Sequence, residues 1–206
     1  QPIPAADVVI LPGSKSTASD LAWLKQQGWD NAIQRHLRYG GKVLGICGGF
    51  QMLDKWVDDP DGLEGKSGKV VGLGLLPLTT RMVAGKQLRN VSGLTVAEGA
   101  TVNGYEIHNG VSDGAALGLP LFKIEGRPEG AVSEDGQIIG TYLHGLFDHP
   151  EACQALLKQL GLVNGEQSDY QAHRERELDR LADMLEAHID IEAVIALIDV
   201  GVSPSR

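Results

Sequence analysis

Residues 42–53 read KVLGICGGFQML, and this stretch decides the fold class. The run from Lys42 to Ile46 is short and apolar, which predicts a buried strand. The glycines on both sides of Cys47 permit a sharp turn, and residues 48–56 (GGFQMLDKW) predict a helix. A strand, a tight turn and a helix in immediate succession are typical of an α/β domain.

Two further buried strands are expected, over residues 7–11 (DVVIL) and 137–142 (QIIGTY). Helices are expected over 17–27, capped by Thr17 or Ser19 and ended by Gly28, and over 30–39. The loop that follows residue 58 is rich in glycine and aspartate. Three strand-like segments between residues 70 and 110 predict a β-meander.

The C-terminal part of the chain predicts helices. Pro150 opens one helix, and residues 169–200 predict a helical tail with Leu178, Leu181 and Leu185 at helical spacing. We expect this tail to cover the sheet. No internal repeat or convincing linker interrupts the chain, which predicts one domain over residues 1–206.

Composition and charge exclude several classes of protein. An apolar fraction of 42% over 206 residues argues against a disordered chain, and a net charge of -9 argues against nucleic-acid binding. No apolar run is long enough to cross a membrane, and the first residues do not read as a secretory signal. Two cysteines do not form a disulfide framework, so a cytoplasmic location is expected.

Cys47 is the candidate nucleophile. A cysteine between a buried strand and a helix projects its Sγ into the crevice at the carboxyl end of the sheet. The helix N-terminus favours the thiolate, and the backbone N–H of Gly48 points to where an oxyanion would form. The alternative is a structural cysteine beside a tight turn, and the local sequence does not decide between the two.

A nucleophilic cysteine needs a base, and His144 is the candidate because it follows the strand over 137–142. That strand can run parallel to 42–46 and bring His144 to Cys47, although a histidine after a strand is often structural. The loop at Gly13 and Ser14 also follows a strand and can supply the second oxyanion donor. Lys15 does not belong to a phosphate loop, because the GxxxxGK[ST] pattern is absent, and no metal-ligand spacing is present.

The motif G-x-C-x-G-x-Q is matched at Gly45, Cys47, Gly49 and Gln51, and the chain resembles the class I (triad-type) glutamine amidotransferases. Over nearly its whole length it looks most like the cobyric acid synthase branch. The segments that carry this resemblance are LPGSKSTASDLAWL (11–24), GICGGFQML (45–53), DP-x-G-x-EG (59–65), GLGLLPLTT (72–80), GYEIHNG (104–110) and GTYLHGLFD (140–148).

The resemblance implies a fold and a reaction. The fold is an open, mostly parallel sheet flanked by helices, with a β-meander insertion and a helical tail, and without the family's first strand. The reaction cleaves glutamine through a thioester on Cys47 with His144 as base. Gln51, Gly13, Ser14 and Gly48 would contact glutamine or its oxyanion. His108 would either hold the pocket or satisfy a hydrogen bond in the core.

Two departures from the family pattern are expected to matter. Leu146 stands where most class I members have an acidic residue, so the group that orients His144 must be something else, and modest activity is expected. No ATP-binding motif is present, so the chain resembles the C-terminal portion of a larger synthase. ATP and Mg²⁺ would belong to an N-terminal synthetase domain, and this chain alone would be unstable or aggregate.

The expected function is therefore the supply of ammonia for ATP-dependent amidation of peripheral carboxylates of adenosylcobyrinic acid a,c-diamide. Two alternatives stay open. One is a related amidotransferase subunit that serves another acceptor, such as a cell-wall lipid intermediate. The other is a non-catalytic module that only docks onto a synthetase partner.

Overall fold

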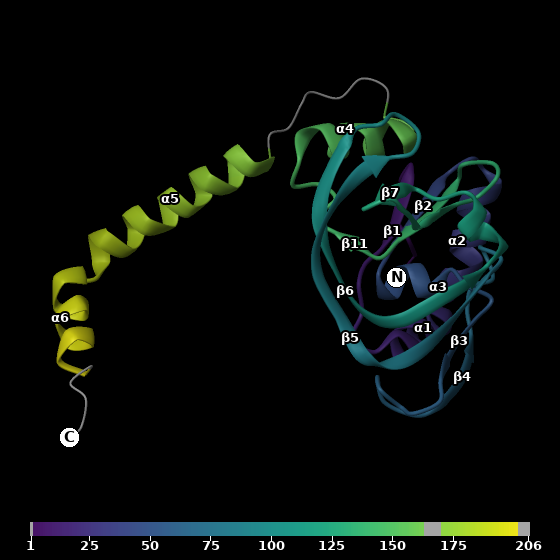
Figure 1. The fold of residues 1–206 in the computed structure, drawn as a ribbon, viewed down its shortest axis with the longest axis horizontal. Coiled ribbons are helices and arrows are strands. Elements are labelled where there is room, and N and C mark those ends of the chain that lie inside the picture. The colour runs from purple at the N-terminus through teal and green to yellow at the C-terminus, as the bar shows by residue number, and fades with distance from the viewer. Residues whose placement is uncertain (1, 163–169, 202–206) are drawn as a thin grey trace. The chain divides into compact units, whose positions relative to one another are not determined.

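The computed structural model describes residues 2–162 and 170–201, and the chain divides into two compact units between residues 167 and 168. The first unit holds two sheets with their helices, and the second holds two helices (Figure 1). The prediction of a single domain over residues 1–206 stays a prediction.

The predicted parallel sheet is confirmed. Its strand order is β1-β2-β10-β9, with β1 and β10 both parallel to the central β2. Leu11 of β1 and Gly140 of β10 both pair with Gly45, so the carboxyl ends of the three strands meet at one edge. The strands are β1 (Val8–Leu11), β2 (Lys42–Ile46), β9 (Ala131–Val132) and β10 (Ile138–Thr141).

Helices cover both faces of this sheet because successive side chains of β2 point to opposite sides. Val43 packs in one buried cluster with Leu21 of α1, and Leu44 packs in another with Leu156 of α4. The helices of the first unit are α1 (Thr17–Gln26), α2 (Trp29–Arg38), α3 (Gly48–Met52) and α4 (Pro150–Gln159), with a short 3-10 helix at Ala115–Gly118.

Two local predictions about these helices were wrong. Neither Thr17 nor Ser19 caps α1, because Ser16 occupies the cap position without a side-chain hydrogen bond. Instead, the Thr17 backbone N–H donates to a carboxylate oxygen of Glu64, 3.0 Å away. The helix that begins at Gly48 is also shorter than predicted, because the chain after Met52 turns and forms strand β3.

The predicted meander is a second, mixed sheet with the strand order β11-β6-β5-β3-β4. Its centre is the long hairpin β5–β6 that sweeps across Figure 1. The hairpin register breaks between Met82 and Gln87, so residues 83–86 oppose Asn109 alone. The strands are β3 (Trp56–Asp59), β4 (Gly68–Val71), β5 (Leu78–Thr95), β6 (Thr101–Gly114), β7 (Phe122–Ile124), β8 (Arg127–Glu129) and β11 (Leu143–His144).

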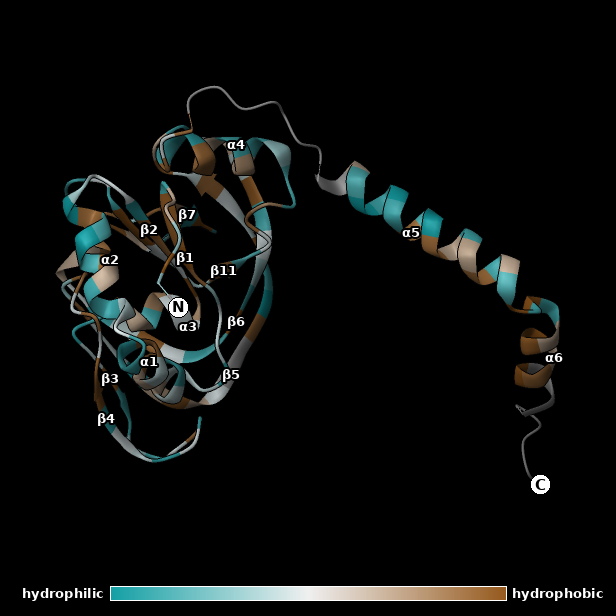
Figure 2. Ribbon diagram, turned by 180° about the vertical axis from the view of Figure 1, so that it is seen from behind, coloured by the Kyte–Doolittle hydropathy of each residue, from teal (hydrophilic) through white to brown (hydrophobic). Residues whose placement is uncertain are grey.

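The second unit confirms the predicted helical tail as α5 (Tyr170–His188) and α6 (Ile191–Gly201); the predicted start at Asp169 lies outside the described residues. Leu178, Leu181 and Leu185 are exposed on α5, and Figure 2 shows α6 as the more apolar helix. That this tail covers the sheet stays a prediction. Within the described ranges, no helix is both long and apolar enough to cross a membrane.

Candidate functional site

A pocket of about 470 Å³ opens where the carboxyl ends of the parallel strands meet. All seven residues that the sequence singled out for the site line this one pocket. They are Gly13, Ser14, Cys47, Gly48, Gln51, His108 and His144. The fold therefore brings the predicted site together, while the chemical role of each residue stays a prediction.

Cys47 occupies a strained turn at the floor of this pocket. Its φ of 52° and ψ of -110° lie in a region that non-glycine residues rarely adopt. Its backbone N–H donates to the carbonyl oxygen of Thr141 at 2.8 Å, which ties the ends of β2 and β10 together. Its thiol lies 3.5 Å from the carbonyl oxygen of Ile107 on β6. The turn thus holds a nearly buried Sγ between the two sheets.

The turn depends on the two glycines that follow Cys47. A Cβ atom on Gly49 would overlap the carbonyl group of Leu11 at the end of β1. A Cβ on Gly48 would lie 2.7 Å from the backbone nitrogen of Ser14. Only glycine allows so close an approach, and it places the N-terminus of α3 directly against the loop after β1.

His144 lies in the same pocket as Cys47. A Cβ on Gly13 would lie 3.7 Å from both the Cβ of Cys47 and the Cε1 of His144, so the two side chains flank the same glycine. The His144 ring stacks on Tyr105 with a centroid separation of 5.0 Å and an angle of 7°. Among the described residues, its buried Nε2 has no hydrogen-bond partner.

The environment of His144 favours the neutral form of its ring. Burial lowers its pKa first, and the nearby His108 lowers it further. Leu146, at the position where an acidic residue would orient the ring, is 3% exposed and packs in the core. A neutral imidazole with a free nitrogen is the form that accepts a proton from a thiol.

His108 is held differently. Its Nδ1 lies 2.8 Å from the carbonyl oxygen of Gly110, and its ring stacks on Tyr142 at 3.9 Å. Because a carbonyl only accepts, Nδ1 carries the hydrogen and Nε2 is the free acceptor of the neutral ring. Burial lowers the pKa of His108 as the largest effect. His108 thus both lines the pocket and satisfies a backbone group.

Gln51 lies at the back of the pocket and is 2% exposed. Its Oε1 accepts from the Thr17 hydroxyl at 3.1 Å, and its Nε2 donates to the Tyr142 hydroxyl at 3.4 Å. The Tyr142 hydroxyl also lies 3.4 Å from Thr80, whose own hydroxyl donates to the fully buried Asp54 at 2.6 Å. Sequence analysis missed this buried chain, because its members come from four stretches that lie far apart in the sequence.

Two charged residues of the pocket were also missed. Lys15 and Glu64 line it together with the predicted residues. The Asp59 carboxylate orders the loop that carries Glu64 by accepting from the backbone N–H groups of Leu63 and Glu64. The DP-x-G-x-EG pattern was the available signal, but it did not reveal which residue reaches the pocket.

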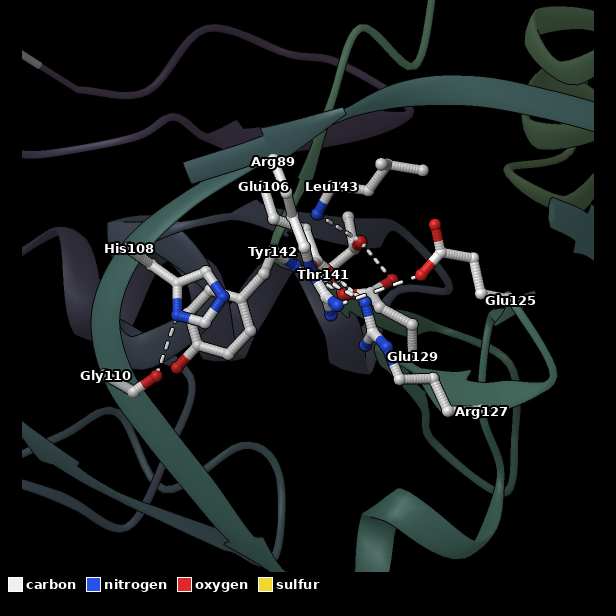
Figure 3. A network of polar contacts seen from close by, with 10 residues as sticks. All are labelled: Arg89, Glu106, His108, Gly110, Glu125, Arg127, Glu129, Thr141, Tyr142 and Leu143. Carbon is white, nitrogen blue, oxygen red and sulfur yellow. Dashed lines mark hydrogen bonds and ion pairs between the residues drawn. The ribbon is translucent and has the colours of Figure 1, made fainter. Parts of the chain in front are cut away.

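A carboxylate–arginine network supports the strands that carry both histidines (Figure 3). Glu106 on β6 accepts from Arg89 at 2.8 Å and from Arg127 at 2.7 Å. These two arginines hold the pKa of Glu106 below its usual value, against the opposing effect of its burial. The strand segment next to His108 is therefore anchored by an ionised carboxylate.

The second carboxyl group of this network is Glu129. It accepts from the Thr141 hydroxyl and from the Tyr142 backbone N–H, both at 2.7 Å. The Thr141 oxygen in turn accepts from the Leu143 backbone N–H at 2.9 Å. Burial raises the pKa of Glu129 to about 7. Glu129 thus fixes the chain between β10 and His144.

A protein-family model described as a CobB/CobQ-like glutamine amidotransferase domain matches residues 1–152. The fold is also similar to two solved structures. One is titled "Crystal structure of glutamine amidotransferase", with a TM-score of 0.58, 20% identity, and coverage of 76% of this chain and 80% of that chain. The other is PurLQS from Thermotoga maritima, with a TM-score of 0.55, 16% identity, and coverage of 78% and 81%.

Proposed function

The chain belongs to the CobB/CobQ-like glutamine amidotransferase domain family, and from that premise we propose that it is the glutaminase portion of a cobyric acid synthase. The observation that carries the glutaminase reaction is the meeting of Cys47, in its strained turn, with His144 in one pocket. A nucleophile and a neutral base at the same sheet edge are what amide cleavage requires.

The reaction proceeds through a thioester. His144 accepts the proton of the Cys47 thiol, and the sulfur attacks the side-chain amide carbon of glutamine. The proton passes from His144 to the leaving nitrogen, the carbon–nitrogen bond breaks, and ammonia departs. Water, deprotonated by His144, then attacks the thioester, and glutamate leaves as the thiol is regenerated. The N–H groups of Gly48 and Ser14 stabilise the oxyanion of both steps.

The charged residues of the pocket fit the amino-acid end of the substrate. Glutamine carries an α-ammonium and an α-carboxylate, and the pocket offers the Glu64 carboxylate and the Lys15 ammonium. Opposite charges at these two positions favour a free amino acid over a peptide-bound glutamine. Gln51 lies at the back of the pocket, where hydrogen bonds with Thr17 and Tyr142 hold its side-chain amide in one orientation.

The Glu64 assignment is tested with glutaramate, which is glutamine without its α-amino group. A charge-assisted hydrogen bond contributes roughly 1.5–3 kcal/mol, so Glu64→Gln should reduce the preference for glutamine over glutaramate by about 10- to 100-fold in kcat/KM. Lys15→Met is the matched control, because it should weaken both substrates equally. An unchanged preference in Glu64→Gln would contradict the assignment.

The acceptor and the partner are proposed from the sequence motifs. The GYEIHNG segment supplies His108 and the GTYLHGLFD segment supplies His144 to the pocket. Both segments resemble the cobyric acid synthase branch, in which an ATP-binding synthetase domain, with ATP and Mg²⁺, would amidate the corrin carboxylates in the cytoplasm. The alternatives are another acceptor, such as a cell-wall lipid intermediate, and a non-catalytic docking module.

The glutaminase reaction is tested by glutamate release from glutamine. Cys47→Ala should abolish release, and the matched control Cys153→Ala should leave it unchanged. Equal labelling rates of the two thiols by iodoacetamide, with no glutamate release, would favour the docking module. The acceptor is tested by adding a synthetase partner and comparing glutamine-dependent amidation of adenosylcobyrinic acid a,c-diamide with that of a lipid-linked cell-wall precursor.

A further inference from the structure

His144 lacks the acidic neighbour that would orient a catalytic histidine, because Leu146 stands in that position and is buried. We propose that Tyr105 is the positioning residue for His144 and holds its ring by stacking instead of by a hydrogen bond. The inference rests on the proposed glutaminase function and concerns how its base is held. It is carried by the near-parallel contact of the two rings.

The contact is built into the strand pairing. His144 on β11 lies directly opposite Tyr105 on β6 in an antiparallel pair, where facing side chains are close neighbours. The rings are 5.0 Å apart and within 7° of parallel, which is an offset stacking geometry. A stacked contact restricts rotation of the imidazole out of its plane and does not use either ring nitrogen as a contact atom.

Stacking orients a ring only if both backbones are fixed, and the network of Figure 3 fixes them. Glu106 follows Tyr105 and is held by Arg89 and Arg127. Leu143 precedes His144, and its N–H is held by Thr141, whose hydroxyl donates to Glu129. Glu106 and Glu129 therefore hold the backbone of the strands that carry the two rings, and they position the imidazole only indirectly.

This arrangement makes a specific demand on residue 105. The ring face is used and the hydroxyl is not, so phenylalanine should replace tyrosine without loss. A leucine of similar apolar character should fill part of the space but leave the imidazole free to rotate. Tyr39, which is 86% exposed and does not line the glutamine pocket, provides the matched control.

The experiment compares steady-state glutaminase kinetics of the full chain with those of Tyr105→Phe, Tyr105→Leu and Tyr39→Leu. Because a misplaced general base costs roughly 10- to 100-fold, Tyr105→Leu should lower kcat by about that factor with KM within about twofold. Tyr105→Phe and Tyr39→Leu should retain wild-type kcat. Full kcat in Tyr105→Leu, or a loss in Tyr105→Phe equal to that in Tyr105→Leu, would overturn the proposal.

A second measurement detects the Tyr105–His144 stack independently of catalytic activity. The His144 Hε1 resonance, assigned with His144→Ala, should show a ring-current shift in wild type and Tyr105→Phe that disappears in Tyr105→Leu. An unchanged resonance in Tyr105→Leu would also overturn the proposal, even if the chain released no glutamate. Absence of glutamate release from the wild type would instead count against the proposed function, so the two failures are distinguishable.

Discussion

Two histidine–tyrosine stacks meet at the pocket, and they differ in how the imidazole nitrogens are used. His108 stacks on Tyr142, and its Nδ1 is committed to the carbonyl oxygen of Gly110. His144 stacks on Tyr105, and its buried Nε2 has no partner among the described residues. Burial lowers the pKa of both rings. The comparison teaches that neutrality alone does not define a base, since position also matters: His144, and not His108, flanks Gly13 together with Cys47.

The tyrosines differ as well. Tyr142 is buried, and its hydroxyl contacts Ser112, Thr80 and Gln51, while Tyr105 is 41% exposed. Burial raises the pKa of Tyr142 to about 12. The His108–Tyr142 stack is therefore part of a buried polar network. The His144–Tyr105 stack is partly exposed, which allows the imidazole to exchange protons with a substrate.

The largest effect should separate the two histidines. His144→Ala should lower kcat for glutamate release by about 10²- to 10⁴-fold, because it removes the general base. His108→Ala should lower kcat/KM by about 10-fold, because it opens the pocket wall without removing the proton acceptor. Steady-state kinetics of the two variants provide the measurement. The reverse order would exchange the roles that we assign to the two rings.

The next effect concerns Asp54, which is linked through Thr80 to the Tyr142 ring of the His108 stack. Burial raises the pKa of Asp54 from 3.8 to about 7 in the folded chain. The protonated form is therefore favoured by folding, and its stabilising contribution is present below pH 4 and lost as the pH rises towards 7.

Asp54→Asn removes this titration. Between acid and neutral pH, the wild type should lose a few kcal/mol of unfolding free energy relative to the variant, on the order expected for such a pKa shift. Urea unfolding at pH 5 and pH 7.5 measures the difference. A difference that does not change with pH would show that Asp54 is ionised when folded.

A smaller effect should distinguish the two tyrosine hydroxyls. Tyr142→Phe removes the hydrogen bond to Ser112 at 2.7 Å and leaves Gln51 Nε2 without its acceptor, which should cost about 1–3 kcal/mol of unfolding free energy. Tyr105→Phe should cost almost nothing. Equal destabilisation of the two variants in urea titrations would contradict the distinction between a buried and a peripheral stack.

The smallest effect is expected far from both stacks. Cys153 lies on α4 with a half-buried thiol, and burial raises its pKa. Cys153→Ser should change the unfolding free energy by about 1 kcal/mol or less and leave kcat unchanged. In the wild type, iodoacetamide should label Cys47 first, as followed by peptide mass spectrometry; earlier labelling of Cys153 would count against an activated Cys47.

Much of the parallel sheet was predictable because its signals are local. The apolar run at residues 7–11 is stopped by Pro12, and the run at 42–46 is followed by Cys47 and two glycines; both predicted strands match β1 and β2 within one residue. The prediction that the strand before His144 runs parallel to β2 is confirmed by the register. Since parallel strands share one carboxyl edge, the meeting of Gly13, Cys47 and His144 followed from topology.

The wrong predictions concern positions whose structure depends on distant partners. Residues 56–59 form β3 because they pair with β4 and β5, which the WVDD pattern does not reveal. The N-terminus of α1 is capped by Glu64 from 47 positions away, so the local candidates Thr17 and Ser19 were misleading. Sequence patterns report neighbours within a few residues, and these contacts lie outside that range.

The sequence by itself determined the α/β class, the turn at Cys47 and the edge at which the site forms, because glycine spacing and apolar runs act on the local backbone. Only the tertiary structure decided which nitrogen is free, which tyrosine covers which histidine, and which carboxylates lie beneath them. Those properties depend on β6 crossing the ends of β2 and β10, and burial then shifts the pKa values of the groups enclosed there.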